Sequence, residues 1–93
     1  MTRLTPDAFA GATSTGKAHV LFGQSDPESG RMAGIIKQSS VASYFVDIDS
    51  SEGAQVAMRA SVRVSPVVKV YEDGFVTKEF TADQLTGLEV LGD

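Results

Sequence analysis

Cysteine is absent from this chain of 93 residues, and its absence excludes several kinds of chemistry. Without a thiol there can be no disulfide, no thiolate metal ligand and no cysteine nucleophile. Histidine is also scarce: His19 is the only one, and one imidazole does not make a metal site. We therefore expect no metal and no cofactor, and we interpret His19 as a core or surface side chain of a strand.

Positive charge is scarce as well. Eight Lys and Arg residues against twelve Asp and Glu residues give a net charge of -4, and the cations form no run. Nucleic acids and anionic membranes attract clustered Lys and Arg, so we expect neither as a partner. No apolar run approaches the length of about 18 residues that suggests a membrane span. Because the first residues also lack the apolar stretch of a signal peptide, we expect a cytoplasmic protein.

The remaining sequence is that of an ordinary small globular protein, with 42% hydrophobic residues, and we expect one domain over residues 1–93. Cap and breaker residues predict four helices, which open at Thr5-Pro6-Asp7, Asp26-Pro27-Glu28, Asp49-Ser50-Ser51-Glu52 and near Thr81 or Ala82. Apolar runs predict strands at 17–22, 43–48, 66–71 and 75–80, the last two joined by an Asp73-Gly74 hairpin. The order α-β-α-β-α-β-β-α predicts an α/β fold: a four-stranded mixed central sheet flanked by helices.

Two packing expectations follow from this arrangement. The last helix would place Leu85, Leu88 and Leu91 on one face. Tyr71 and Phe75 flank the hairpin turn, and we expect them to pack against each other across the two strands.

Several segments resemble members of the thioredoxin family: Leu4 to Phe9, Phe45-Val46-Asp47-Ile48-Asp49, Val62-Arg63-Val64-Ser65-Pro66 and Val70-Tyr71-Glu72-Asp73-Gly74. In that family they are the opening helix, a strand ending in an Asn/Asp-x-Asp step, a loop ending in a cis-proline, and a hairpin with a glycine turn. The resemblance covers residues 3–91. It implies a thioredoxin-like fold and a cis bond between Ser65 and Pro66.

The Cys-x-x-Cys redox motif of that family has no counterpart here. A gapless alignment puts Asp26-Pro27-Glu28-Ser29 in its place, and a shift by one residue would instead use Ser25 and Glu28. We prefer the gapless register because it preserves the helix that follows. Disulfide exchange requires a thiolate, so the resemblance is to a redox-inactive member. The family's buried Asp and its Lys partner fall at the apolar Val20 and Phe45, which removes the proton relay.

The resemblance also implies a binding surface. In the family, the backbone before the cis-proline pairs with an extended peptide, which is strand addition. We therefore expect a polypeptide partner, and we expect Phe22 to be exposed beside Val64 as a small apolar patch. The candidate protein-binding residues are Gln24, Ser25, Asp26, Pro27, Ser29, Val64, Ser65 and Pro66. The alternative interpretation is an ordinary helix cap and a proline that only shapes the turn.

Three functions are compatible with the sequence. We assign no catalytic residue, although the third function could use the hydroxyl of Ser25 or Ser29. The preferred hypothesis is a non-catalytic protein-binding, chaperone-like or assembly module. The second is a structural subunit of a larger assembly such as a phage or secretion particle. The third, an enzyme that uses glutathione without a thiol of its own, is disfavoured because Asp26 and Glu28 make the helix start unsuitable for an anion.

Overall fold

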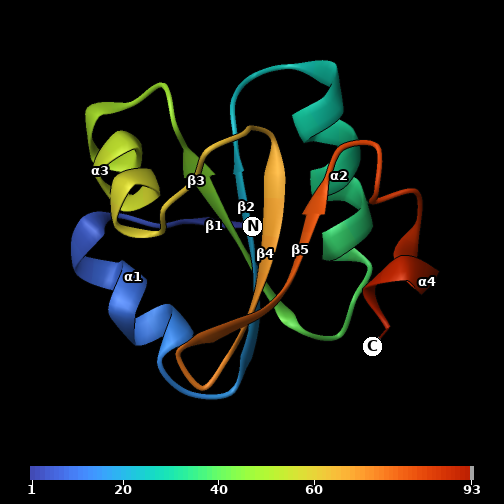
Figure 1. Ribbon diagram of the computed structural model, residues 1–93, viewed down its shortest axis with the longest axis horizontal. Helices are drawn as coiled ribbons and strands as arrows, with labels where there is room; N and C mark the ends of the chain where they lie inside the picture. The colour runs from blue at the N-terminus through green and yellow to red at the C-terminus, as the bar shows by residue number, and fades with distance from the viewer. Residues whose placement is uncertain (93) are drawn as a thin grey trace.

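The computed structural model describes residues 1–92, and its centre is a mixed five-stranded sheet in the order β1-β3-β2-β4-β5 (Figure 1). The strands are β1 (Thr2–Arg3), β2 (Lys17–Gly23), β3 (Ala42–Asp47), β4 (Val67–Glu72) and β5 (Phe75–Thr81). The β1–β3 and β2–β3 pairs are parallel, whereas the β2–β4 and β4–β5 pairs are antiparallel. The predicted α/β architecture is confirmed, with one strand more than the four expected.

The additional strand, β1, lies at one edge of the sheet. Thr2 pairs with Tyr44 and Arg3 with Phe45, and the N–H of Leu4 donates to the carbonyl of Phe45 at 2.9 Å. Both β1 residues are exposed. Two residues are too few to show a period-two pattern, so this strand has no signature in the sequence.

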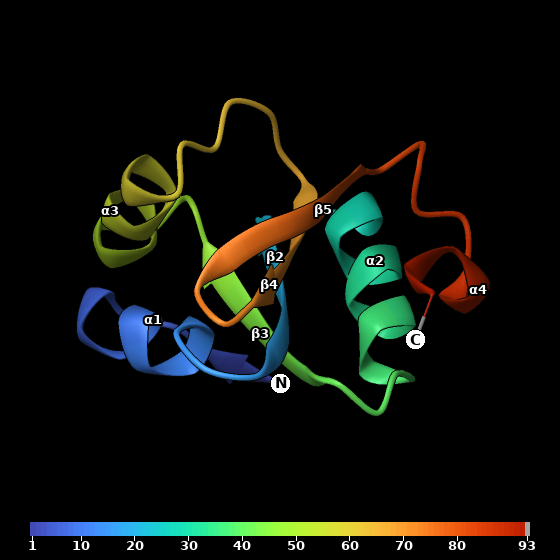
Figure 2. The ribbon, with the colours of Figure 1, turned by 60° about the horizontal axis from the view of Figure 1, so that its bottom comes forward.

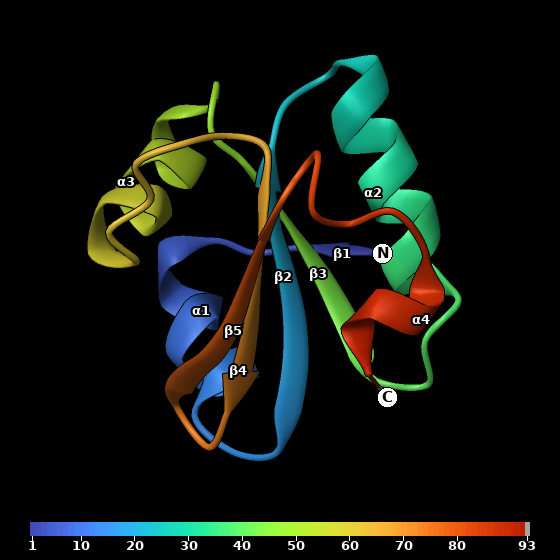
Figure 3. The ribbon, with the colours of Figure 1, turned by 45° about the vertical axis from the view of Figure 1, so that its right-hand side comes forward.

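Helices cover both faces of the sheet. They are α1 (Pro6–Thr13), α2 (Pro27–Lys37), α3 (Ser51–Arg59) and α4 (Leu88–Leu91). α1 and α3 lie on one face, and α2 and α4 lie on the other (Figures 2 and 3). The core accordingly has two parts, because successive side chains of a strand point to opposite faces. One contains Leu4, Val20, Phe22, Val46, Val56, Val67 and Tyr71, and the other contains Leu21, Met32, Ile36, Val68, Leu85 and Leu91.

The first two helices begin at the predicted caps. The hydroxyl of Thr5 accepts from the N–H of Ala8 at 3.3 Å, and a carboxylate oxygen of Asp26 accepts from the N–H of Ser29 at 2.7 Å. Both helices have proline in the first turn, where its missing N–H is not needed. Local cap chemistry therefore fixes where the chain turns into α1 and α2.

The cap of α3 differs from the prediction by one residue. Ser50 is the cap: its hydroxyl accepts from the N–H of Gly53 at 2.9 Å and donates to the carbonyl of Asp47 at 2.8 Å. The expected cap, Asp49, donates its own N–H to the carboxylate of Asp47 at 3.0 Å. A hydroxyl both donates and accepts, whereas a carboxylate only accepts, so serine suits the position that must do both.

The predicted last helix is wrong in its first half. β5 runs to Thr81, and the chain then turns until α4 begins at Leu88. Arg31 on α2 donates to the carbonyls of Leu85, at 2.6 Å, and of Ala82. Side-chain bonds within 81–84 compete with helix formation there as well. Gly87 is thus the residue before α4 and not an interior helical residue.

The hairpin between β4 and β5 has the predicted turn. Asp73 and Gly74 have φ values of 52° and 92°, the positive pair expected of a tight hairpin. The predicted contact between Tyr71 and Phe75 is wrong, because the register pairs Tyr71 with Val76. The ring of Tyr71 packs edge-on against Phe9 at 5.7 Å, while Phe75 is 75% exposed.

Gly53 offers a test of the α3 packing. A Cβ atom at this position would lie 1.7 Å from the carbonyl oxygen of Asp47, so Gly53→Ala must displace either α3 or the end of β3. We expect it to lower the free energy of unfolding by about 1–3 kcal/mol, measured by urea denaturation. The matched control is Gly34→Ala on α2, where a Cβ would meet nothing within 4 Å and stability should rise by about 0.5–1 kcal/mol. Equal stability of Gly53→Ala and wild type would contradict the close approach.

Candidate functional site

The segment between β2 and α2 is closed by hydrogen bonds around Ser29, whose side chain is buried. Its N–H donates to Asp26, and its hydroxyl oxygen accepts from the N–H of Gln24 at 3.1 Å. Hydrogen bonds from the Ser29 side chain and then from its backbone lower the pKa of Asp26 below its ordinary value. The two residues aligned with the lost redox motif thus serve to cap a helix.

This segment meets the loop before β4 at a close junction. The Ser65–Pro66 peptide bond is cis. A Cβ atom on Gly23 would lie 2.5 Å from the hydroxyl oxygen of Ser29 and 3.6 Å from the Cβ of Pro66. The hydroxyl of Ser65 also donates to the amide oxygen of Gln24 at 3.3 Å. The structure therefore brings the two predicted parts of the site into contact, and glycine at the end of β2 permits that approach.

Next to this junction, residues 63–65 present open backbone. Val64 is 56% exposed, and within residues 1–92 no hydrogen bond involves the main chain of 63–65. The expectation for Phe22 is wrong, because its side chain is fully buried beneath α1 and α3. β2 is a central strand with helices over both faces, so its side chains from Ala18 to Phe22 are all buried. Of the predicted apolar pair Phe22 and Val64, Val64 is therefore the one whose side chain is exposed at this junction.

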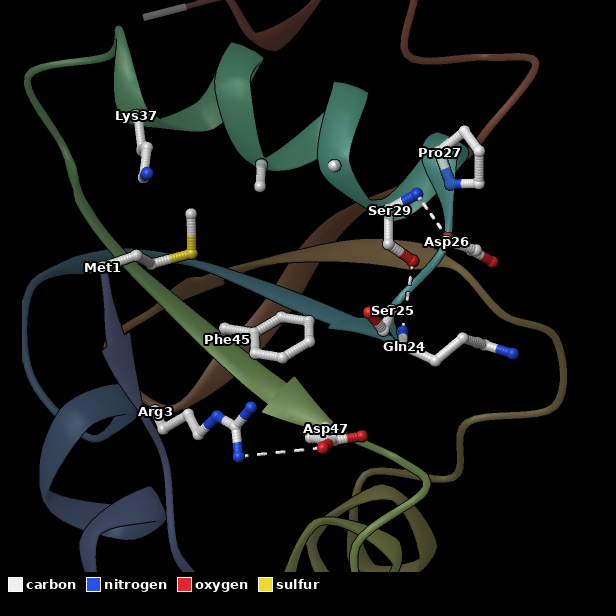
Figure 4. A pocket seen from close by; sticks show the side chains of 12 residues that line it. Met1, Arg3, Gln24, Ser25, Asp26, Pro27, Ser29, Lys37, Phe45 and Asp47 are labelled. Carbon is white, nitrogen blue, oxygen red and sulfur yellow. Dashed lines mark hydrogen bonds and ion pairs between the residues drawn. The ribbon is translucent and has the colours of Figure 1, made fainter.

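A pocket of about 600 Å³ lies on the other side of residues 24–26, between α2 and the strands β1 and β3 (Figure 4). Five of the predicted site residues line it, namely Gln24, Ser25, Asp26, Pro27 and Ser29, whereas Val64, Ser65 and Pro66 do not. The lining residues that were not predicted are Met1, Arg3, Gly30, Ala33, Lys37, Phe45 and Asp47. A local sequence pattern does not predict this set, because Met1 and Arg3 reach β3 only through the pairing of β1 with β3.

The positions of the family's proton relay are apolar and packed. Val20 is fully buried among the residues under α1 and α3, and Phe45 packs against those under α2 and α4. The two side chains thus lie in different parts of the core. Within residues 1–92, no group of three or more His, Cys, Asp or Glu residues could hold a metal ion. No helix in the same range is long and apolar enough to span a membrane.

The lowered pKa of Asp26 predicts a pH dependence. A carboxyl whose folded pKa lies below its ordinary value of 3.8 adds stability above that value and loses it as the pH falls through the folded pKa. Asp26→Asn keeps an oxygen that can cap α2 but cannot titrate. We therefore expect wild type to lose stability relative to Asp26→Asn as the pH falls below about 4, measured by urea unfolding at each pH. Asp83, whose pKa is lowered by hydrogen bonds from the Thr81 hydroxyl and from its own backbone, titrates in both proteins and cancels.

A constant stability difference between wild type and Asp26→Asn across this pH range would contradict the assignment. Asp26→Ala serves as the control for the cap itself, because it should be less stable than Asp26→Asn at every pH.

Comparison with solved structures identifies the fold. The structure is similar to oxidised thioredoxin O2 from Arabidopsis thaliana (TM-score 0.74, 17% identity, 98% of this chain and 85% of that one). It is also similar to a point mutant of thioredoxin from Halobacterium salinarum (TM-score 0.74, 18% identity, 90% and 82%). A designed protein matches as well (TM-score 0.78, 13% identity, 98% and 88%).

At these identities the likeness concerns the fold. No family model matches the sequence, and no curated protein matches it either. The chain therefore has the thioredoxin fold that its sequence predicts, and, having no cysteine, it cannot carry out thiol–disulfide exchange.

Proposed function

We propose that this chain is a non-catalytic thioredoxin-like module that binds a polypeptide partner in a chaperone-like or assembly role. The redox positions support this proposal, because Asp26 and Ser29 direct their polar atoms to each other and to the backbone of Gln24. Neither residue is poised as a nucleophile beside a general base. What the surface offers instead is unpaired main chain.

The open backbone of residues 63–65 is the observation that supports binding most directly. An extended peptide can add to such a segment through main-chain hydrogen bonds, with side-chain contacts providing selectivity. The exposed Val64 would supply an apolar contact, and the side chains of Ser65 and Gln24 would supply polar ones. The loop packs near Gly23 and Ser29 through Pro66. Since this packing holds the loop in place before a partner arrives, the entropy cost of ordering it on binding would be small.

The other parts of the functional hypothesis stay predictions from the sequence. They are a cytoplasmic location and the exclusion of nucleic acid, membrane and metal as partners. The net charge of -4 supports the exclusion of nucleic acid and of anionic membranes.

Affinity capture from a lysate of the source cell, read by mass spectrometry, tests the proposal. We expect a protein that wild type retains and Val64→Asp/Ser65→Arg does not, because the double variant removes the apolar contact and adds charge beside the open backbone. The matched control is Met58→Asp on α3, which also places an acid at an exposed apolar position (81% exposed). Equal retention by wild type and the double variant would contradict a site at residues 63–66.

One observation favours the second candidate, a structural subunit of a larger assembly. β5 is the outer strand of the sheet, and two of its apolar side chains are exposed, Phe75 (75%) and Val76 (41%). Unpaired strand edges are natural places for another chain to add. A stoichiometric complex that survives Val64→Asp/Ser65→Arg but not Phe75→Lys would favour this candidate over the first.

A further inference from the structure

The pocket between α2 and the sheet is an apolar slot. The face of α2 that lines it carries only Gly30 and Ala33 between its two ends, and a Cβ on Gly30 would meet nothing within 4 Å. The ring of Phe45 and the side chain of Met1 face this part of α2 from the strands (Figure 4). A volume of about 600 Å³ lies within the range of small-molecule sites. The guanidinium of Arg3 lies over the Phe45 ring, 5.7 Å from its centroid. The small residues of α2 thus leave room for a ligand between α2 and Phe45, on the side of the ring that Arg3 does not cover.

Opposite charges stand at the two ends of this slot. Lys37, at the end of α2, lies beside Met1, whereas Asp26 and Asp47 lie at the other end (Figure 4). Among the residues that the structure describes, Lys37 makes no ion pair or hydrogen bond. One carboxylate oxygen of Asp26 caps α2. The charged groups that can meet a ligand in the pocket are therefore the ammonium of Lys37, the guanidinium of Arg3 and the second carboxylate oxygens of Asp26 and Asp47.

Asp47 keeps one oxygen available. Its first carboxylate oxygen accepts from the N–H of Asp49 at 3.0 Å. The second oxygen lies 3.7 Å from the guanidinium of Arg3, a distance too long for a hydrogen bond. Because the Arg3 side chain is 68% exposed, this ion pair is weak, and a ligand ammonium can compete with it.

The length of α2 limits the length of a ligand that lies along it. The 11 residues of α2 span about 16 Å at about 1.5 Å per residue. An extended peptide covers about 3.3 Å per residue, so a peptide of at most about five residues can lie along α2.

We propose that this pocket binds a short free peptide by its two ends. The terminal ammonium meets Asp47, the terminal carboxylate meets Lys37, and apolar side chains lie between Phe45 and Ala33. The proposal is independent of partner binding at residues 63–66, because Val64, Ser65 and Pro66 do not line the pocket.

Titration of the isotopically labelled full chain with Ala-Leu-Phe-Ala, followed by amide NMR shifts, tests this proposal. We expect saturable shifts at Gly30, Ala33, Lys37 and Phe45. An N-acetylated peptide and a C-amidated peptide should each bind about tenfold more weakly, equivalent to about 1.4 kcal/mol per lost end. Equal binding of the doubly blocked peptide, or no saturable shift, would overturn the proposal.

Charge-removing variants assign each end. Lys37→Gln should weaken binding of the free peptide about tenfold and leave the C-amidated peptide unchanged, and Asp47→Asn should do the same for the ammonium end. Asn retains an oxygen for the N–H of Asp49. The matched control is Arg59→Gln on α3, which covers the opposite face of the sheet and should bind as wild type does. An equal loss in Arg59→Gln would mean that net charge alone drives binding, which would overturn the proposal.

Two further variants separate the pocket from the proline loop. Ala33→Leu should abolish binding by filling the slot, without a change in fold, because Ala33 is only partly buried. Val64→Asp/Ser65→Arg should bind the free peptide as tightly as wild type. Loss of peptide binding in this double variant alone would place the peptide at residues 63–66 and overturn the pocket proposal.

Discussion

The close packing at Gly23, Ser29 and Pro66 is the constraint on which both surfaces depend. Three segments meet there: the end of β2, the first turn of α2 and the loop that enters β4. A Cβ atom at Gly23 would lie 2.5 Å from the Ser29 hydroxyl oxygen, so any other residue there would have to displace the Ser29 side chain. The open backbone of residues 63–65 lies on one side of this junction and the pocket on the other. Either surface would lose its shape if the junction opened.

The interior beneath this junction explains why the site has no proton chemistry. Val20 and Phe45 occupy the positions that the resemblance assigns to a buried Asp and its Lys partner. A buried charge requires a partner and hydrogen bonds, whereas a packed apolar side chain requires neither. At the start of α2, Asp26 accepts from the N–H of Ser29, and the hydroxyl of Ser29 accepts from the N–H of Gln24. These two residues therefore stabilise the local structure.

Most of the local features that the sequence predicts depend on a few neighbouring residues. Thr5 and Asp26 cap their helices, and Asp73-Gly74 makes its turn, because each rule involves only a few consecutive residues. The prediction of the last helix was wrong because contacts with a distant segment determine the structure there. Arg31 on α2 donates hydrogen bonds to the carbonyls of residues 82 and 85. The sequence of residues 81–91 does not show that a side chain from α2 competes for these carbonyls with helix formation.

The same distinction explains the candidate site. The sequence predicts contact between residues 24–29 and 64–66 because each group lies in a contiguous motif, and the structure brings the two groups together. Phe22 was misplaced because a strand pattern does not show that helices cover both faces. The pocket was missed because Arg3 joins Asp47 only through β1, a strand too short to predict.

Differences between the two exposed edges bear on the choice between transient binding and permanent assembly. On β5, Glu79 pairs with the buried Lys69 at 3.3 Å, and Lys78 donates to the carbonyl of Leu91 at 3.4 Å. Charged residues on an edge strand discourage pairing with another sheet. The open segment also carries a charge, on Arg63, so charge does not distinguish the two surfaces. The main chain of residues 63–65 makes no hydrogen bond within residues 1–92, whereas β5 already pairs with β4 along one side. This difference in main-chain pairing supports the peptide-binding proposal over a subunit joined through its sheet edge.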